Sequence, residues 1–357
     1  MDFVVIMAGG KGERFWPKSR QQTPKQLLAL FGNKTLLELT IERAKEIVPY
    51  ENILVITNMK QQQKIREVAH MIPEENIIGE PVGKNTAPCI GLAAKIIEQK
   101  DPEGVMMVLP ADHIIPTQKE FSENMKDACI VAKDTCSLIP FGISPAFPET
   151  GYGYIRVSEK IDTGKKTLFY RANGFFEKPD AAAAQQYIKA GNFFWNSGMF
   201  LWRCDVILEA FEKYLPKMYK DLNTLGSLQE GEISNSLQSF YQKTEAISID
   251  YGVMEKAENV LVARADFSWD DVGSWSSLER HLHKDANGNV GVGEYVTVDS
   301  KNCIVSGQER LIATVGLDNM IIVDTEDALL VCDKSKAQDV KKIVSLLKKN
   351  KKHKKYL

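Results

Sequence analysis

Short apolar runs alternate with amphipathic helical patterns through the first third of the chain, and this alternation constrains the fold most strongly. Buried strands are predicted at residues 3–7, 53–56 and 105–109. Helices are predicted at residues 35–48, 60–69 and 86–98. The order predicts an α/β fold with a Rossmann-like mixed, mostly parallel sheet and helices on both faces.

The pattern changes after about residue 285, where short β runs are separated by Gly, Asn and Asp. We therefore expect a main α/β domain at 1–285 and a small, solenoid-like β domain at 286–357, although the runs are too irregularly spaced to define a repeat. The short strands should pack on the first domain or on a second subunit, as in a homodimer. A helix from about Ala337 and a basic tail, Lys348 to Lys355, close the chain, and we expect the tail to be solvated.

Composition is typical of a globular protein and excludes several partner classes. The 357 residues are 44% hydrophobic and 26% charged, and the net charge of −2 gives no general attraction to nucleic acid or anionic membranes. No apolar stretch approaches the roughly 20 residues that span a bilayer. The six cysteines are scattered without a CxxC pair. We expect a cytoplasmic protein with reduced, half-buried thiols.

A glycine-rich segment, AGGKGERFWP from Ala8, follows the first predicted strand and is succeeded by Pro24-Lys25-Gln26. Glycines at such a point let backbone N–H groups converge on an anion, and Lys11, Arg14 and Lys25 would add positive charge. The spacing matches neither GxGxxG, which disfavours a dinucleotide-dependent dehydrogenase, nor a Walker A loop. Asp112 follows another strand, and ligands of open sheets bind beyond such strand ends. The segment is therefore predicted to bind phosphate.

With these residues, the sequence resembles the nucleotidyltransferases that activate sugar 1-phosphates, and within them the bacterial mannose-1-phosphate guanylyltransferases. Seven further motifs occur in the family's order: EPVGKNTAP from Glu80, LPADH from Leu109, GYGYI from Gly151, FEKP from Phe176, NSGMF from Asn196, SIDYGVMEK from Ser248 and WDDVGSW from Trp269. The sequence departs from the family at Phe15, usually Leu, and at Lys84, usually Arg. The role of Lys84 is therefore open, because lysine lacks the paired donors of arginine.

The resemblance implies the following site residues. The catalytic residues would be Arg14, Lys25, Lys178 and Asp112. The nucleotide-binding residues would be Ala8, Gly9, Gly10, Lys11, Gly12, Glu80, Asn85, Thr86 and Pro110. The sugar-phosphate-binding residues would be Tyr152, Gly153, Glu177, Asn196 and Asp250. Asp112 and Asp271 would hold Mg²⁺, which suits a hard cation, although the neighbouring Asp270 could replace Asp271.

The implied reaction joins mannose 1-phosphate to GTP, giving GDP-mannose and pyrophosphate, with residues 1–285 as the catalytic domain. The same chemistry with another pair, such as UTP or dTTP with glucose 1-phosphate, is the nearest alternative. A catalytically inactive subunit that binds a sugar nucleotide is a second alternative, which the joint presence of Arg14, Lys25, Asp112, Lys178 and Asp271 disfavours.

Overall fold

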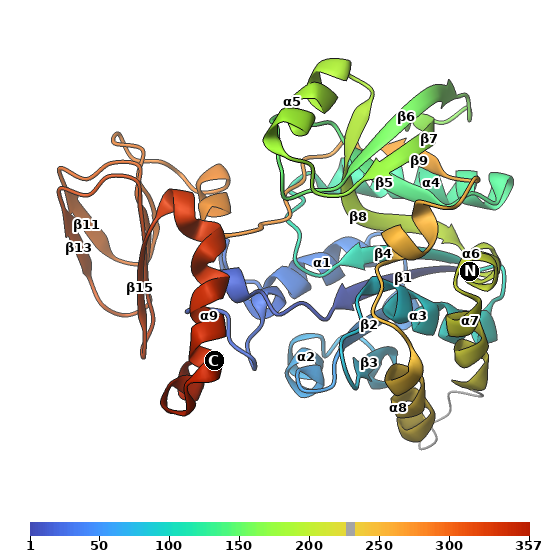
Figure 1. The fold of residues 1–357 in the computed structure, drawn as a ribbon, viewed down its shortest axis with the longest axis horizontal. Coiled ribbons are helices and arrows are strands. Elements are labelled where there is room, and N and C mark those ends of the chain that lie inside the picture. The colour runs from blue at the N-terminus through green and yellow to red at the C-terminus, as the bar shows by residue number, and fades with distance from the viewer. Residues whose placement is uncertain (226–232) are drawn as a thin grey trace. The chain divides into compact units, whose positions relative to one another are not determined.

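The computed structural model describes residues 1–225 and 233–357 and contains two compact units (Figure 1). Unit 1 comprises residues 1–9, 40–111 and 115–269. Unit 2 comprises residues 10–39, 112–114 and 270–357. The glycine-rich segment thus clusters with the C-terminal residues, whereas the division after residue 285 stays a prediction.

A nine-stranded mixed sheet forms the centre of unit 1, in the order β3-β2-β1-β4-β8-β5-β9-β7-β6. Its strands are β1 (Asp2–Ala8), β2 (Ile53–Asn58), β3 (Ile77–Glu80), β4 (Val105–Pro110), β5 (Ile139–Ile143), β6 (Tyr154–Ile161), β7 (Phe169–Phe176), β8 (Phe193–Arg203) and β9 (Leu261–Arg264). The first four strands pair in parallel, while β8 runs antiparallel to both β4 and β5. The three strands predicted from apolar runs are therefore confirmed as β1, β2 and β4.

Helices cover both faces of this sheet, because alternate residues of a strand point to opposite sides. Met106 and Val108 of β4 belong to the buried cluster that includes α3 and α6, whereas the sulfur of Met107 lies 3.7 Å from Cys129 of α4. The helices between residues 36 and 243 are α1 (Leu36–Lys45), α2 (Gln62–Val68), α3 (Thr86–Lys100), α4 (Gln118–Thr135), α5 (Ala181–Ala190), α6 (Cys204–Tyr214), α7 (Pro216–Leu222) and α8 (Ile233–Lys243). The predicted helices at 35–48, 60–69 and 86–98 are confirmed as α1, α2 and α3.

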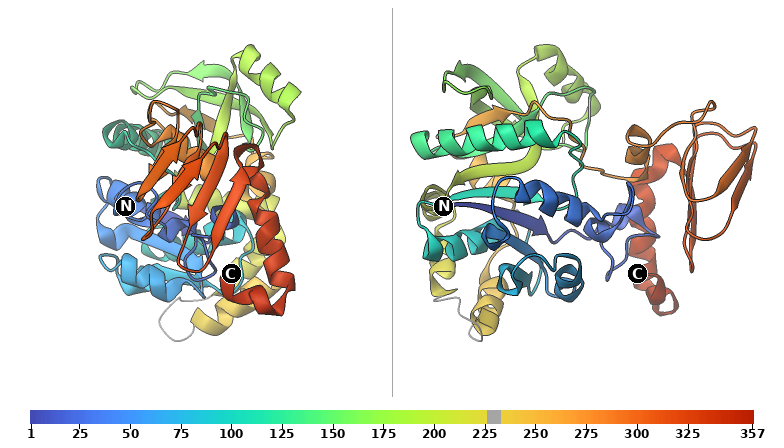
Figure 2. Two further views of the ribbon diagram at one scale, coloured as in Figure 1. Left: turned by 90° about the vertical axis from the view of Figure 1, so that its left-hand side faces the viewer. Right: turned by 180° about the vertical axis from the view of Figure 1, so that it is seen from behind.

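Unit 2 contains short strands in two stacks, as Figure 2 shows for the orange and red part of the chain. The strands are β10 (Val290–Val292), β11 (Tyr295–Val298), β12 (Ile304–Ser306), β13 (Ile312–Val315), β14 (Met320–Asp324) and β15 (Leu329–Asp333). Val290, Ile304 and Ile321 lie beside one another in parallel register, and Tyr295 lies beside Ile312. The solenoid-like prediction is confirmed, and the unequal loops between the rungs explain why no repeat was visible in the sequence.

One apolar cluster joins these strands to the glycine-rich segment within unit 2. Phe15 and Trp275 are almost fully buried, with ring centroids 5.1 Å apart, and the cluster also contains Val290 and Ile321. Helix α9 (Val340–Lys349) adds Val340 and Val344 to it.

The last residues of the chain contact the same segment. The Tyr356 carbonyl accepts hydrogen bonds from Trp16 Nε1 at 2.9 Å and from Arg20, and Leu357 packs on the cluster. The tail lysines 351, 352, 354 and 355 are exposed, as expected. The predicted tail, Lys348 to Lys355, is exposed, whereas the two residues that follow it contact the glycine-rich segment, because the indole N–H of Trp16 needs an acceptor that Tyr356 provides.

All six cysteines are free thiols, and four of them are buried rather than half-buried: Cys89, Cys129, Cys204 and Cys303. Cys136 is exposed and Cys332 is intermediate. Within residues 1–225 and 233–357, no helix has the length and apolar character needed to cross a membrane.

Candidate active site

The glycine-rich segment folds back on Lys25, and Gly12 is the residue that permits this. Gly12 has a φ of 60°, and a β-carbon there would lie 2.3 Å from the β-carbon of Lys25. Any side chain at position 12 would therefore clash with Lys25. The close approach brings the cations of the segment to one place.

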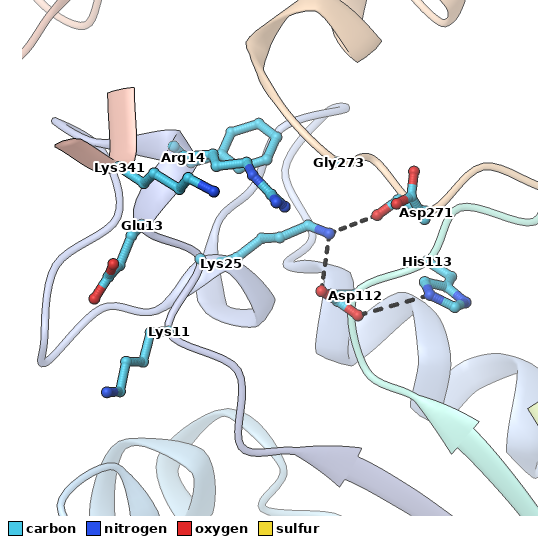
Figure 3. A pocket seen from close by; sticks show the side chains of 11 residues that line it. Lys11, Glu13, Arg14, Lys25, Asp112, His113, Asp271, Gly273 and Lys341 are labelled. Carbon is cyan, nitrogen blue, oxygen red and sulfur yellow. Dashed lines mark hydrogen bonds and ion pairs between the residues drawn. The ribbon is translucent and has the colours of Figure 1, made fainter. Parts of the chain in front are cut away.

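A pocket of about 520 Å³ lies in unit 2 around these cations (Figure 3). Its lining includes the predicted residues Lys11, Gly12, Arg14, Lys25, Asp112 and Asp271, together with Glu13, Phe15, His113, Gly273 and Lys341. Strands β1 and β4 pair in parallel with Met7 opposite Pro110, so the chain leaves both at the same sheet edge. This topology explains how residues far apart in the sequence reach one pocket.

Lys25 is the centre of the polar network in the pocket. Its side chain is 8% exposed, and Nζ donates to Asp112 Oδ2 at 2.8 Å and to the Asp271 carbonyl at 2.5 Å. Desolvation raises the pKa of Asp112, but the charges of Lys25 and His113 outweigh it, so the pKa lies below its usual value. Asp112 is therefore a carboxylate at neutral pH.

Asp270 and Asp271 have clearly different environments. Asp270 is buried, and Arg280 binds both its oxygens, with Nε at 2.5 Å from Oδ2 and a terminal nitrogen at 2.8 Å from Oδ1. His281 Nε2 lies 2.8 Å from Oδ2 as well. Desolvation raises the pKa of Asp270, yet these partners together lower it strongly. The alternative in which Asp270 replaces Asp271 is therefore disfavoured, since Asp271 is the one that lines the pocket.

The segment after Asp271 is strained, since Val272 has a φ of 48° and is fully buried. A β-branched residue in the left-handed region is uncommon and is kept only where the surroundings enforce it. The Val272 N–H donates to Asp270 Oδ1 at 2.7 Å, which helps to enforce this conformation. The carbonyl of the preceding residue, Asp271, accepts the hydrogen bond from Lys25.

The residues present fit a divalent ion that shares its ligands with a substrate. No group of three or more His, Cys, Asp and Glu side chains that could hold a metal occurs in the described part of the chain. Two carboxylates, Asp112 and Asp271, nevertheless line one pocket beside several cations. A small hard cation is commonly held by one or two carboxylates plus substrate phosphates, and this donor set suits it.

The predicted sugar-binding residues converge elsewhere, in unit 1. Asn196 Nδ2 donates to Asp250 Oδ1 at 2.7 Å, and its N–H donates to the Gly153 carbonyl at 2.8 Å. Glu177 Oε2 lies 2.8 Å from where a β-carbon on Gly153 would be. The glycine therefore leaves room for the carboxylate, and acceptor oxygens gather at one place.

The charges in this cluster are largely negative. Desolvation raises the pKa of Asp250, and the nearby Glu177 raises it further. Lys178 Nζ lies 2.6 Å from Glu177 Oε1, while its side chain is 63% exposed and its φ is 44°. Exposed and held on a strained backbone, Lys178 is accessible to an anionic ligand.

Three aromatic residues pack beside this cluster. The Tyr152 ring lies 5.3 Å from Trp195 and 5.3 Å from Trp269, edge-on in both contacts. Trp195 and Trp202 are buried, so they pack in the interior rather than present open stacking faces. In the GYGYI motif, Tyr154 and Ile155 are fully buried at the start of β6, so this part of the motif is core.

Glu80, a predicted nucleotide-binding residue of unit 1, forms a buried pair with Tyr241. Glu80 ends β3, is 5% exposed and accepts a hydrogen bond of 2.7 Å from the Tyr241 hydroxyl. Desolvation raises the pKa of Glu80 to about 7, although the Tyr241 hydrogen bond opposes the rise. Gly9 approaches this pair, because a β-carbon there would lie 3.3 Å from Glu80 Oε2.

Asn85 and Thr86 begin helix α3 and have structural partners. Asn85 has a backbone φ of 71°, and its side-chain oxygen accepts a hydrogen bond from the Thr86 N–H at 2.9 Å. Thr86 Oγ1 accepts from the Ile249 N–H at 2.9 Å, next to Asp250. The two residues thus fix the helix start and the Asp250 segment, and their contact with a nucleotide stays a prediction.

Sequence reasoning missed two residues. Lys341 comes from α9 and Tyr241 from α8, both outside every motif. The sequence predicted a helix from about Ala337, but nothing in it indicated that this helix would contact the glycine-rich segment near the start of the chain. Ala8 and Pro110 end their strands in unit 1, whereas Gly10 belongs to unit 2.

A pocket that combines several cations with two carboxylates suited to a divalent ion is typical of enzymes that bind phosphorylated substrates. The chain belongs to the nucleotidyl transferase family, whose model matches residues 3–288. A model described as a mannose-phosphate-isomerase/GMP-like β-helix domain matches residues 293–347. Nucleotidyltransferases generally use a divalent metal ion.

The chain is similar to known proteins over nearly its whole length. It is 39% identical to "mannose-1-phosphate guanylyltransferase 2" of Escherichia coli O157:H7, covering 97% of this chain and 73% of that protein. It is 38% identical to "alginate biosynthesis protein AlgA" of Pseudomonas aeruginosa, covering 95% of this chain and 71% of that protein. A crystal structure from Thermus thermophilus, named as a mannose-1-phosphate geranyltransferase, superposes with a TM-score of 0.88 at 36% identity, covering 97% and 99% of the two chains.

Proposed function

We propose that this enzyme joins mannose 1-phosphate to GTP, releasing pyrophosphate and GDP-mannose. The observation that carries the proposal is the Lys25–Asp112 network in a pocket that also holds Arg14 and Lys11. The name of the Escherichia coli relative supports the choice of mannose and guanine, and the name of the Thermus thermophilus structure supports mannose.

The proposed reaction is an in-line displacement at the α-phosphorus of GTP. A phosphate oxygen of mannose 1-phosphate forms the new bond, the bond from the α-phosphorus to the bridging oxygen breaks, and pyrophosphate leaves with the electron pair. The attacking phosphate is already ionised at neutral pH, so no general base is required. Catalysis then rests on alignment and charge neutralisation.

Each group of residues has one task in this proposal. Lys11, Arg14 and Lys25 neutralise the departing pyrophosphate, and Lys178 binds the phosphate of the sugar substrate. Glu177, Asn196 and Asp250 accept hydrogen bonds from sugar hydroxyls or position those that do. Asp112 and Asp271 would hold Mg²⁺, which supplies charge neutralisation at the nucleotide phosphates when it is bound.

Nucleotide selection is assigned to the predicted nucleotide-binding residues. Gly9, Gly10 and Gly12 permit close approach of the backbone to phosphate, and Glu80 with Asn85 and Thr86 would contact the nucleoside. A carboxylate such as Glu80 suits guanine, whose ring N–H and amino group are both donors.

We also propose a homodimer and a cytoplasmic location. The solenoid strands expose Val296, Val298 and Val315 at 50%, 56% and 69% of their surface, on the neighbouring strands β11 and β13. A contiguous apolar face of this kind is typical of an interface. Six cysteines that stay thiols suit a reducing compartment.

A substrate panel tests the proposed function. Pyrophosphate release is measured for each of the four common nucleoside triphosphates with mannose 1-phosphate and with glucose 1-phosphate. GTP with mannose 1-phosphate should give the highest kcat/KM. Highest activity with UTP or dTTP and glucose 1-phosphate would replace the proposed substrates, and no release with any pair would refute the transferase proposal.

A further inference from the structure

Four cations, Lys11, Arg14, Lys25 and Lys341, line the pocket of unit 2, against three carboxylates, Glu13, Asp112 and Asp271. Lys25 is paired with Asp112, and Glu13 is paired with Lys348 Nζ at 2.5 Å. The remaining cations are Lys11, Arg14 and Lys341, and their side chains make no hydrogen bond or ion pair with any residue that the structure describes. Arg14 Nε is moreover buried without an acceptor. Such clustered cations and an orphaned donor indicate a polyanionic ligand.

Lys341 is the member of this group that belongs to no sequence motif. It lies in the first turn of α9, and Figure 3 shows its side chain extending toward Arg14 and Lys25. The N-terminal end of a helix carries a partial positive charge, so a lysine there is electrostatically unfavourable. The adjacent Lys342 offsets this cost with an ion pair to Asp339 at 2.9 Å, whereas Lys341 has no ion pair of this kind in the described chain.

Helix α9 is also held firmly against the glycine-rich segment. Val340 and Val344 are buried in the core cluster on either side of Lys341 along the helix. Farther along, Lys348 pairs with Glu13, and the Tyr356 carbonyl accepts from Trp16. These contacts fix the backbone of α9 relative to Arg14, so the Lys341 ammonium is positioned at the pocket without a lid motion.

We propose that Lys341 is a further phosphate-binding residue of the nucleotide site, contacting the β- and γ-phosphates that leave as pyrophosphate. The inference rests on the proposed function for the identity of this ligand. It assigns part of the nucleotide site to α9, outside the segments that carry the family's motifs. The C-terminal helix therefore contributes to substrate binding as well as to the core.

The test compares Lys341→Met with Lys342→Met, its matched control on the same turn, and with Lys341→Arg. Calorimetry measures the binding of Mg²⁺–pyrophosphate, GTP and GMP to the full-length enzyme. In Lys341→Met the Kd values for pyrophosphate and GTP should rise about 3- to 10-fold, with the Kd for GMP unchanged, because GMP lacks the outer phosphates. Lys342→Met should bind all three ligands as the wild type does, and Lys341→Arg should restore most of the loss.

The inference is overturned if Lys341→Met binds pyrophosphate like the wild type, if Lys342→Met weakens binding equally, or if the wild type does not bind pyrophosphate. These outcomes are separate from the substrate panel. If the enzyme turns over GTP with mannose 1-phosphate and Lys341→Met binds pyrophosphate like the wild type, the proposed function stands and only the inference about Lys341 is refuted. If Lys341→Met weakens pyrophosphate binding but the enzyme does not use GTP, the inference about Lys341 stands and the substrate is another nucleoside triphosphate.

Discussion

The pocket of unit 2 and the acceptor cluster of unit 1 have opposite electrostatic character. In the pocket, Arg14, Lys11 and Lys341 are cations without a paired acid in the described chain. In the cluster, desolvation and the nearby Glu177 raise the pKa of Asp250, and the exposed Lys178 pairs with Glu177. Unpaired donors suit phosphate oxygens, and gathered acceptors suit sugar hydroxyls. The contrast indicates which substrate each region binds.

Among the variants that test this contrast, Asp112→Asn should have the largest effect on turnover. The change removes a charged oxygen that pairs with Lys25 and would hold the metal, so turnover should fall at least about 100-fold. Circular dichroism should show the fold retained, and the exposed Asp299→Asn should behave as the wild type. Near-normal Mg²⁺-dependent turnover in Asp112→Asn would remove Asp112 from the proposed site.

Two lysine variants should show directly that the two regions bind different substrates. Lys25→Met keeps the packing against Gly12 but loses the ammonium, so the KM for GTP should rise about 10-fold or more while that for mannose 1-phosphate changes little. Lys178→Met should show the reverse. Lys189→Met, on the exposed surface of α5, serves as the control. Identical defects in both variants toward one substrate would contradict the division of roles.

The raised pKa of Glu80 predicts that the stability of the fold depends on pH. Its pKa of about 7 in the folded protein exceeds its ordinary value of 4.5, so the folded state binds more protons between these values. The free energy of unfolding should therefore fall as pH rises from about 4.5 to 7, by up to about 3 kcal/mol. Glu80→Gln should abolish this slope, and the exposed Glu75→Gln should preserve it. The measurement is urea unfolding at pH 5 to 8, and an unchanged slope in Glu80→Gln would be contrary evidence.

The smallest effect is expected from the tail. Removing residues 350–357 deletes the Tyr356 carbonyl and Leu357, so Trp16 and Arg20 lose an acceptor. The free energy of unfolding should fall by about 1 kcal/mol, lowering Tm by roughly 2 °C. Full-length protein carrying Lys351→Ala and Lys352→Ala should melt like the wild type. Differential scanning calorimetry distinguishes the two, and equal Tm values for the truncated and intact chains would restore the view of a solvated tail.

Local sequence signals predicted those parts of the molecule that depend on local physics. The apolar runs of β1, β2 and β4 and the periodicity of α3 are visible without knowledge of the tertiary fold. The family resemblance grouped Lys25, Asp112 and Asp271, and the positions of Lys25 after the glycine-rich segment and of Asp112 after a strand agreed with it. The antiparallel insertion of β8 between β4 and β5 could not be predicted, since it depends on long-range pairing.

The site residues that escaped prediction are those whose role depends on distant partners. Tyr241 acts on Glu80 from another helix, and Lys341 reaches the pocket only because the solenoid returns the chain to Phe15 and Trp16. Asp270 and Asp271 are equivalent in the sequence, and the contacts of Arg280, His281 and the Val272 N–H with Asp270 distinguish them. Tertiary context, rather than residue type, decides each of these cases.

The central claim is that the pocket cations stabilise departing pyrophosphate while sugar phosphate attacks the α-phosphorus. Phosphorus NMR of a reaction with GTP and mannose 1-phosphate tests it most directly, since each product has its own resonances. Pyrophosphate and a new sugar-linked diphosphate should appear in equal amounts, with no orthophosphate. The appearance of GDP with orthophosphate, or of a doubly phosphorylated sugar, would place the attack at the γ-phosphorus and contradict the account.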